Sequence, residues 1–362
     1  MTTNLLLDQP LSPAAVRTHV GRVLDDFLDR KAHAAHTAHL PGEAVQALRA
    51  FLHAGGKRLR PVLCAAGWHA ADGRGDLRPV LQVAASLETF HAFCLIHDDI
   101  MDNSATRRGS PTMHRALAEH HTPGHGTARA ARIGTSAAIL IGDLALAWSD
   151  ELLHTTAGLS GKQLTDILPL IDAMRTEVMY GQYLDATATG HPTTDLDHAL
   201  AVIRYKTAEY TVERPLHIGA ALAGAGPQLL AALSAFALPV GEAFQLRDDL
   251  LGVFGDPAAT GKPSLDDLRD GKHTALIALP LKRARPAQAD QLRLFLGCPT
   301  LTDDQARAAR RIITDSGAVH TVEEMITKRY EDAMTALDAA PIHPAAKNAL
   351  HRLADSAVRR HT

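Results

Sequence analysis

The sequence has few cysteines and no excess of basic residues, and each shortage excludes a class of protein. The three cysteines, Cys64, Cys94 and Cys298, are widely separated, which excludes a disulfide framework or a cysteine zinc site and favours a cytoplasmic protein. The formal net charge is -3, so a dedicated nucleic-acid-binding protein is not expected. Asp8 directly follows three leucines near the N-terminus, so this segment predicts neither a signal peptide nor a membrane span.

The sequence also lacks sustained period-two alternation, and aromatic residues make up only 4% of it. Hydrophobic residues reach 46%, mainly through Ala and Leu, which are the strongest helix formers, so we expect an all-α protein. Long apolar stretches predict helices over residues 80–101, 128–157, 162–188, 196–223 and 226–254. Breaks too short for interdomain linkers occur at 72–79, 122–127 and 255–264. One domain over residues 1–362 is therefore expected.

Aspartate is unusually frequent, with 29 Asp against 11 Glu, and three Asp-Asp-x-x-Asp strings occur. The string at 25–29 precedes Arg30 and Lys31 in a charge-rich stretch, and we interpret it as a solvated helix face. The string at 98–102 ends a largely apolar stretch, where buried carboxylates would be costly without cations. The context of each string, rather than the string itself, therefore decides its meaning.

Asp98 and Asp102 are four residues apart, so on a helix they share one face about 6 Å apart along the axis. Carboxylates in that arrangement suit Mg²⁺, which prefers one or two of them plus water and phosphate oxygens. Arg107 and Arg108 follow closely, and guanidinium groups form forked contacts with phosphate.

A second acidic cluster lies near residue 248. The i, i+3, i+4, i+7 positions of one helix face are Gln245, Asp248, Asp249 and Gly252. A glycine-punctuated loop with Lys262 and Lys272 follows. Two acidic helices, each followed by a basic loop, are typical of a divalent-metal diphosphate site. The alternative is two independent charged helix ends.

Six motifs, in order along residues 40–280, resemble the trans-isoprenyl diphosphate synthases, the polyprenyl synthetase family. They are GGKRLRP (55–61), HDDIMDNSATRRG (97–109), GQYLD (181–185), YKTAEYT (205–211), FQLRDDLLG (244–252) and GKPSLDDLRDGKHT (261–274). The resemblance implies an all-α bundle around a deep central cavity. It also implies a homodimer that condenses an allylic diphosphate with isopentenyl diphosphate in a Mg²⁺-dependent reaction.

The resemblance also implies roles for individual residues. The ligands of the Mg²⁺ ions, three to a site in this family, would be Asp98, Asp102 and Asp248, supported by Asp99 and Asp249. The allylic diphosphate would be held by Arg107, Lys206 and Lys262. The isopentenyl diphosphate site would comprise Lys57, Arg60, His91 and Arg108. The allylic cation would be stabilised by Thr207 and Gln245, with Gln182 and Asp185 lining the same cavity. Residues near motif positions that could be structural are Lys272 and Arg58.

The implied mechanism is ionisation, condensation and elimination. Metal ions and basic side chains would polarise the allylic diphosphate until its C–O bond breaks, with dipoles directed at the cation in a dry cavity. The isopentenyl double bond would then attack, and released pyrophosphate would accept the final proton. Gly252 departs from the family pattern because it stands where a third aspartate is usual. We expect activity to survive this departure, and Asp256 is a candidate substitute.

Product length should depend on the residues one helical turn before Asp98, namely Phe93 and Cys94. Two aromatic residues there would make a shallow floor of the farnesyl type. One aromatic and one small residue resemble the short-chain geranylgeranyl type, so we expect a C20 product. The alternatives are a C15 product and a longer chain, and Phe93 could also be ordinary core.

Three other functions are weighed. A di-iron centre could use two Glu-x-x-His pairs, Glu88 with His91 and Glu151 with His154, but it would leave GGKRLRP and the basic loops unexplained. A class I terpene cyclase would carry an Asn/Ser/Glu metal triad where DDLLG stands. A non-catalytic subunit of a heteromeric synthase would usually have lost its aspartates.

Overall fold

The computed structural model describes residues 12–255 and 265–358. Helices make up almost all regular structure in these residues, and the strands found there are one short antiparallel pair, β1 (Thr106–Arg107) and β2 (Ser110–Pro111). The all-α prediction is confirmed. Backbone contacts divide the chain into two compact units, Met1–Asp166 with Ile218–Gly224 and Ile167–His217 with Ala225–Thr362. A single domain over 1–362 stays a prediction.

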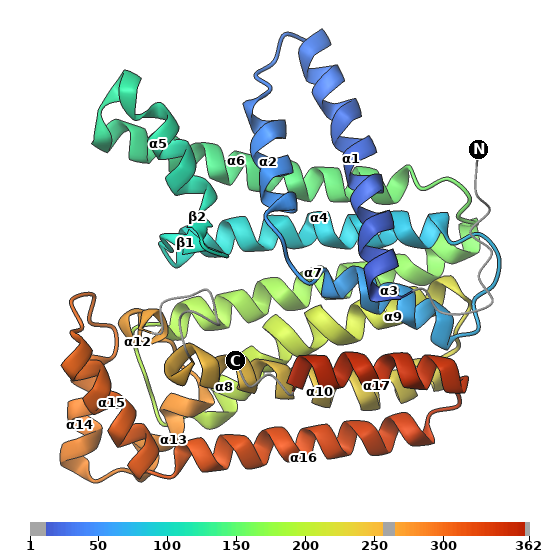
Figure 1. The fold of residues 1–362 in the computed structure, drawn as a ribbon. Helices are drawn as coiled ribbons and strands as arrows, with labels where there is room; N and C mark the ends of the chain where they lie inside the picture. The colour runs from blue at the N-terminus through green and yellow to red at the C-terminus, as the bar shows by residue number, and fades with distance from the viewer. Residues whose placement is uncertain (1–11, 256–264, 359–362) are drawn as a thin grey trace. The chain divides into compact units, whose positions relative to one another are not determined.

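The first unit is built on a long helix pair, in which α4 packs along α6 (Figure 1). Its other helices include α1 and α3, which both contact α4, and α5, which packs on α6. The β1–β2 pair follows the end of α4. The bounds are α1 (Pro13–Thr37), α2 (Glu43–His53), α3 (Leu59–Ala70), α4 (Arg78–Met101), α5 (Met113–His125) and α6 (Thr127–His154).

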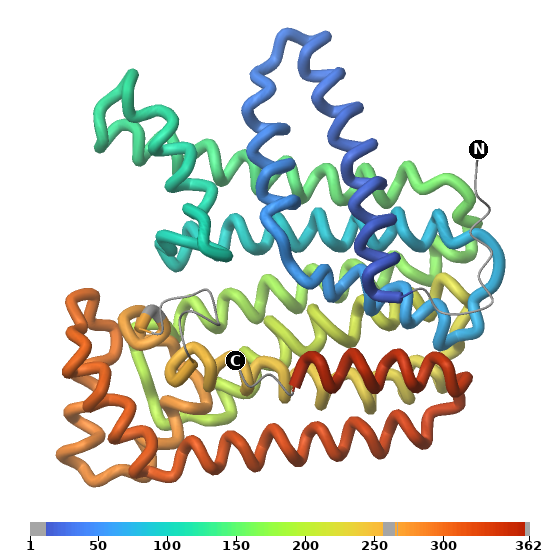
Figure 2. Tube along the Cα trace, in the orientation of Figure 1, coloured from blue at the N-terminus to red at the C-terminus, as the bar shows by residue number. Residues whose placement is uncertain are grey.

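The second unit is centred on α10, which packs against α16 and against the π-helix η1; Figure 2 traces α10 and α16 side by side. Helices α7 and α9 contribute residues to both units. The bounds are α7 (Gly161–Ala188), α8 (Leu196–Val202), η1 (Ile203–Glu213), α9 (Arg214–Leu222), α10 (Pro227–Phe254), α12 (Asp266–Asp270), α13 (Ala275–Arg283), α14 (Pro286–Phe295), α15 (Asp303–Asp315), α16 (Ala318–Ala339) and α17 (Pro344–Val358).

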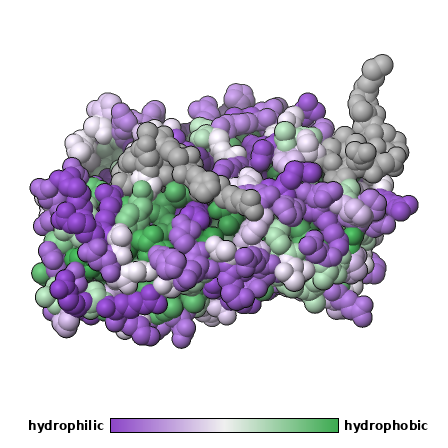
Figure 3. Space-filling model, turned by 60° about the horizontal axis from the view of Figure 1, so that its bottom comes forward, coloured by the Kyte–Doolittle hydropathy of each residue, from purple (hydrophilic) through white to green (hydrophobic). Residues whose placement is uncertain are grey.

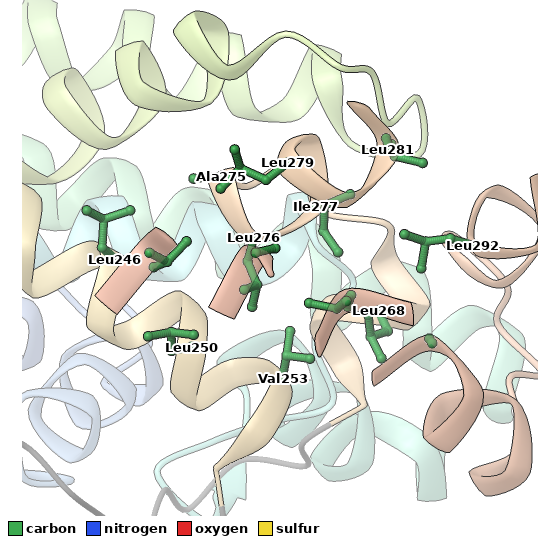
Figure 4. Packing of buried hydrophobic residues seen from close by; sticks show 14 of the residues in the cluster. Leu246, Leu250, Val253, Leu268, Ala275, Leu276, Ile277, Leu279, Leu281 and Leu292 are labelled. Carbon is green, nitrogen blue, oxygen red and sulfur yellow. The ribbon is translucent and has the colours of Figure 1, made fainter. Parts of the chain in front are cut away.

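A leucine-rich core fixes the C-terminal part of α10 in the second unit. Leu246, Leu250 and Val253 project from α10 into a cluster that also takes in Leu268 of α12 and Leu276 of α13 (Figure 4). These positions on α10 are spaced by three and four residues, so they share one helix face. The polar residues between them in sequence, which include the second acidic cluster, therefore point away from this core.

The helices agree closely with those expected from the sequence, and two differences have physical causes. Helix α5 extends into the expected break at 122–127 and ends at His125, because Gly126, with φ 70°, supplies the stop. The expected helix over 196–223 is continuous, but its middle third is the π-helix η1. Periodic hydrophobicity does not distinguish a π-helix from an α-helix over so few turns.

Hydrophilic residues cover most of the face shown in Figure 3, with hydrophobic residues gathered in smaller areas. Among the described residues, α4, α6 and α10 are long and apolar enough to cross a membrane, judged by length and composition alone. The apolar window of α4 is 67% buried within the protein, whereas that of α6 is only 33% buried. The expected absence of a membrane span therefore stays a prediction.

Candidate active site

The first aspartate motif occupies the last turn of α4. Asp98 and Asp102 are both half-buried, and Asp102 is the C-cap residue that follows the last helical residue, Met101. The sequence predicted that they share one face, and their positions one turn apart on a regular helix confirm it. The β1–β2 hairpin begins four residues later, and Arg107 of β1 lies within hydrogen-bond reach of Asp98.

Asp99 differs from its two neighbours because it is almost completely buried and bound by Arg107. The Nε of Arg107 donates to both Asp99 carboxylate oxygens at 2.8 Å, and its Nη2 donates to Asp98 Oδ2 at 3.2 Å. Only 1% of the Asp99 side chain is exposed. Burial raises the pKa of Asp99, and the bond to Arg107 opposes this rise. The geometry therefore gives Asp99 a positioning contact with Arg107, while Asp98 and Asp102 face the more open side of the helix.

Basic side chains surround His91, which lies seven residues, about two helical turns, before Asp98 on α4. Burial and the positive charges of Arg60, Arg107 and Arg108 hold the pKa of His91 well below its ordinary value, so the imidazole is neutral at pH 7. A neutral imidazole that can donate a hydrogen bond, surrounded by three guanidinium groups, suits the binding of a multiply charged anion. The structure thus brings together four of the residues predicted to bind diphosphate.

The GGKRLRP segment joins the same group through backbone contacts. Arg108 of the hairpin turn donates to the carbonyl of Gly55. Arg17 of α1 donates through Nε to the carbonyl of Lys57 at 2.8 Å, and Arg58 donates to the carbonyl of Arg17 at 2.8 Å. These bonds favour the structural alternative for Arg58, which helps to fasten the loop that carries Lys57.

Glu88 belongs to this group and was missed as a member of it from the sequence. It is buried on α4, where burial raises its pKa while the nearby charges of Arg60, Arg58 and Arg108 lower it. Glu88 stands three residues before His91 and so shares its helix face, which is the signal that could have identified it. The sequence analysis considered that pair only as iron ligands. Three neighbouring arginines make a poor environment for a metal cation, so the di-iron alternative loses support.

Phe93 and Cys94 are both half-buried on α4. The Phe93 ring packs against Phe90 with centroids 5.4 Å apart and against His97 with centroids 4.7 Å apart. His97 in turn fits against Gly142 of α6, where an added Cβ would lie 2.4 Å from its Nε2. Phe93 is thus part of an aromatic stack inside the first unit. Its role in limiting product length stays a prediction.

In the second unit, η1 carries Lys206 and Thr207. Two glycines let neighbouring helices approach its backbone: a Cβ at Gly181 of α7 would lie 2.5 Å from Lys206 N, and one at Gly241 of α10 would lie 2.5 Å from Ala208 Cα. Departures from α-helical to π-helical geometry occur frequently at functional sites. The glycine of the GQYLD motif therefore has a packing function, and the π-helix that it contacts presents Lys206 and Thr207.

A hydrogen-bonded chain links η1 to the second aspartate motif. Thr207 Oγ1 donates to Gln245 Oε1 at 2.7 Å, and Gln245 Nε2 donates to Asp249 Oδ1 at 2.8 Å. Beside it, Lys206 Nζ donates to Asp185 Oδ2 at 2.6 Å. The structure thus brings together five residues that the resemblance placed in the site.

Carboxylates gather where this chain ends. Burial and the nearby negative charges of Asp267, Asp248 and Asp185 raise the pKa of Asp249 to about 7, against the opposing bond from Gln245. Concentrated negative charge of this kind is what a hard divalent cation would relieve. Among the described residues no three His, Cys, Asp or Glu side chains form a ready-made metal centre. Mg²⁺ does not require one, because it keeps water ligands and shares phosphate oxygens, so the oxygen-only donors of both motifs fit it.

The remaining predicted residues are placed as follows. Gln182 is half-buried on α7, and Lys272 follows α12, with its backbone N–H donating to the carbonyl of Asp267. Lys262 and Asp256 lie outside the described residues. The string at 25–29 is a charged helix face, because Asp25 and Asp29 pair with side chains of α2. The predicted site residues thus form two groups, one in each unit.

The chain is similar to known proteins over residues of both units. The family model described as polyprenyl synthetase matches residues 42–313, which include residues of both units. A geranylfarnesyl diphosphate synthase of Aeropyrum pernix is 33% identical over 85% of this chain and 92% of its own length. A geranylgeranyl diphosphate synthase of Mycobacterium tuberculosis is 32% identical over 80% of this chain and 77% of its own.

A solved structure extends the likeness to three dimensions. The geranylgeranyl pyrophosphate synthase of Corynebacterium glutamicum, complexed with isoprenyl diphosphate and magnesium, is 40% identical. The likeness covers 98% of this chain and 100% of that one, with a TM-score of 0.91.

Proposed function

The chain belongs to the polyprenyl synthetase family and is a prenyltransferase, and we propose that it condenses isopentenyl diphosphate with an allylic diphosphate to give geranylgeranyl diphosphate. The observation that carries this proposal is the environment of His91. A neutral imidazole among Arg60, Arg107 and Arg108 would attract a diphosphate without requiring a proton of its own. Lys57 is fastened beside this group and would add another positive charge.

The hydrogen-bonded chain in the second unit supports a role for Thr207 in stabilising positive charge. Asp249 Oδ1 accepts the hydrogen bond from Gln245, so the Gln245 amide must turn its NH₂ group toward Asp249 and its oxygen toward Thr207. The hydroxyl proton of Thr207 is therefore committed to Gln245. Its lone pairs stay available, and negative dipoles of this kind stabilise a developing allylic cation.

The acidic groups support Mg²⁺ as the metal. Asp98 and Asp102 would bind Mg²⁺ in the first unit, and Asp248 would bind Mg²⁺ in the second. Water and diphosphate oxygens would complete the coordination of each ion. When bound, Mg²⁺ would neutralise diphosphate charge and so assist cleavage of the allylic C–O bond. Lys206, held by Asp185 at 2.6 Å, would bind a diphosphate as a point charge.

Product analysis tests the proposal. The purified chain is incubated with Mg²⁺, labelled isopentenyl diphosphate and dimethylallyl, geranyl or farnesyl diphosphate, and the dephosphorylated alcohols are separated by length. A C20 alcohol is the expected result, and the same mixture with EDTA is the control. A C15 or longer alcohol would keep the reaction and reject the geranylgeranyl assignment. No product from any starter would reject the reaction and favour a non-catalytic subunit or a cyclase.

A C25 product is the second candidate, because the Aeropyrum relative is named for it. Phe93 is the residue expected to decide between them, since a bulky ring one turn before Asp98 would stop the growing chain earlier than a small residue. In this interpretation the stack of Phe93 on Phe90 and His97 holds the ring in place.

Three further expectations belong to the proposal. A homodimer is expected from the family, and exposed apolar residues on α6, such as Ile139 and Leu140, support an association surface there. A cytoplasmic enzyme without a membrane span is expected, and the three cysteines are all free. No nucleic-acid partner is expected, because the net charge is negative.

A further inference from the structure

The space beside Gly252 is filled by another carboxylate. A Cβ added to Gly252 would lie 1.9 Å from Asp267 Oδ2 and 3.0 Å from Asp267 Cγ. These distances are far below van der Waals contact, so the Asp267 carboxylate stands where a side chain at position 252 would begin. Position 252 is where the second aspartate motif lacks its third acid.

Asp267 is held there by the packing of α12. Leu268, the next residue, is 1% exposed and lies in the core cluster with Val253 and Leu276 (Figure 4). The carbonyl of Asp267 accepts from the backbone N–H of Lys272 at 3.1 Å. A buried anchor on one side and a backbone bond on the other fix the direction of this short segment. The placement of Asp267 against α10 is therefore part of the fold of the second unit.

The charge around Asp267 is the charge of the second motif. Asp267, Asp248 and Asp185 all lie close enough to Asp249 to raise its pKa electrostatically. Lys206 contributes a positive charge to this group of carboxylates, because its Nζ donates to Asp185. A fourth carboxylate adds repulsion to a group that is already acidic, which is costly unless a cation is received there.

We propose that Asp267 supplies, from α12, the third carboxylate that α10 lacks at Gly252, and that it orients the water shell of the Mg²⁺ ion held at Asp248. This inference rests on the proposed function, because it assigns one more residue to the same metal site. It explains why a glycine stands at position 252: a carboxylate there would compete with Asp267 for one space. The acidic string at 266–270 is then part of the site, although its sequence pattern alone is uninformative.

The first test removes the Asp267 charge while keeping its shape. Asp267→Asn should raise the Mg²⁺ concentration for half-maximal activity about 10- to 100-fold, the usual effect of losing an outer-shell partner, while saturating Mg²⁺ restores most of the turnover. Thermal stabilisation by Mg²⁺ with inorganic pyrophosphate should require correspondingly more Mg²⁺. Asp304→Asn is the matched control, because it removes an exposed carboxylate of the same unit. An unchanged Mg²⁺ requirement in Asp267→Asn would overturn the proposal.

The second test moves the carboxylate from one position to the other. Asp267→Gly should raise the Mg²⁺ concentration needed for half-maximal activity. The double variant Gly252→Asp with Asp267→Gly should lower this concentration again, since the new carboxylate occupies the vacated space. Gly252→Asp alone should be destabilised by the collision. A double variant no better than Asp267→Gly would overturn the proposal, because a shared position predicts recovery and independent sites do not.

The outcome separates this inference from the proposed function. If the unmodified chain makes no prenyl product, the proposed function fails whatever Asp267 does. If it makes product and the thermal stabilisation by Mg²⁺ and pyrophosphate is the same in Asp267→Asn, only the assignment of Asp267 fails.

Discussion

A methyl group added at Gly181 would collide with the backbone of η1, and this gives a quantitative test of how the site is built. The new Cβ would lie 2.5 Å from Lys206 N and 2.9 Å from Lys206 Cα. Ordinary contact needs roughly 1 Å more, and neither backbone atom can rotate away. Overpacking of this kind costs about 1–3 kcal/mol of folding free energy. We therefore expect Gly181→Ala to fold but with a lower melting temperature.

The effect on turnover should exceed the effect on stability. Relief of the collision moves Lys206 and Thr207, and a displacement near 1 Å of a positioning group can cost about 100-fold in rate. Gly241→Ala approaches the same helix from α10 and should have a similar effect. The measurement is kcat at saturating substrates and Mg²⁺, with thermal unfolding followed in parallel.

Gly124→Ala is the control, because Gly124 also lies inside a helix, α5, but an added Cβ there would meet open space. It should leave both kcat and melting temperature near those of the unmodified chain. Unchanged turnover in folded Gly181→Ala would refute the reasoning, since the backbone of η1 would then be free to adapt without moving its side chains. A loss confined to stability would refute it equally.

Three further predictions follow from the site. Asp98→Ala should nearly abolish prenyl transfer while leaving the helical circular dichroism intact, and normal activity would refute the metal assignment. Phe93→Ala should lengthen the product, measured by alcohol chain length, and an unchanged length would remove Phe93 as the floor. Asp249→Asn should stabilise the chain in EDTA more as pH rises, because the folded-state pKa of Asp249, about 7, exceeds its ordinary 3.8, so the unmodified chain loses stability as pH rises from 3.8 to about 7. Urea unfolding should show a gain larger by up to about 3 kcal/mol at pH 8 than at pH 5, and a pH-independent gain would contradict the shift.

The sequence predicted the helices well because burial of one apolar face decides them. The stretch 226–254 agrees with α10 to within one residue, since Leu and Ala repeat at helical spacing and Pro227 marks its start. The π-helix η1 was not predictable in this way. Its backbone is packed closely against Gly181 and Gly241, two residues that are distant from η1 in sequence.

The candidate site was predictable where one helix carries its residues. Asp98 and Asp102 were paired correctly because four residues make about one turn. The contact of Arg107 with Asp99 depends on the path of the chain between α4 and β1, and the placement of Asp267 depends on a separate helix packed on α10. Spacing along the sequence carries no information on such contacts, because they are set by tertiary packing.

The exchange of backbone bonds between Arg17 and the loop at residues 55–58 has a consequence for the boundaries of the functional chain. All six motifs lie after residue 54, so a shortened protein beginning after α1 would keep every recognisable signature. It would lose the donor to the Lys57 carbonyl and the acceptor for Arg58. Affinity for isopentenyl diphosphate would then fall although no substrate-binding residue had been removed. The N-terminal helix is in this sense a fastening for the substrate loop, and family signatures alone would mark it as dispensable.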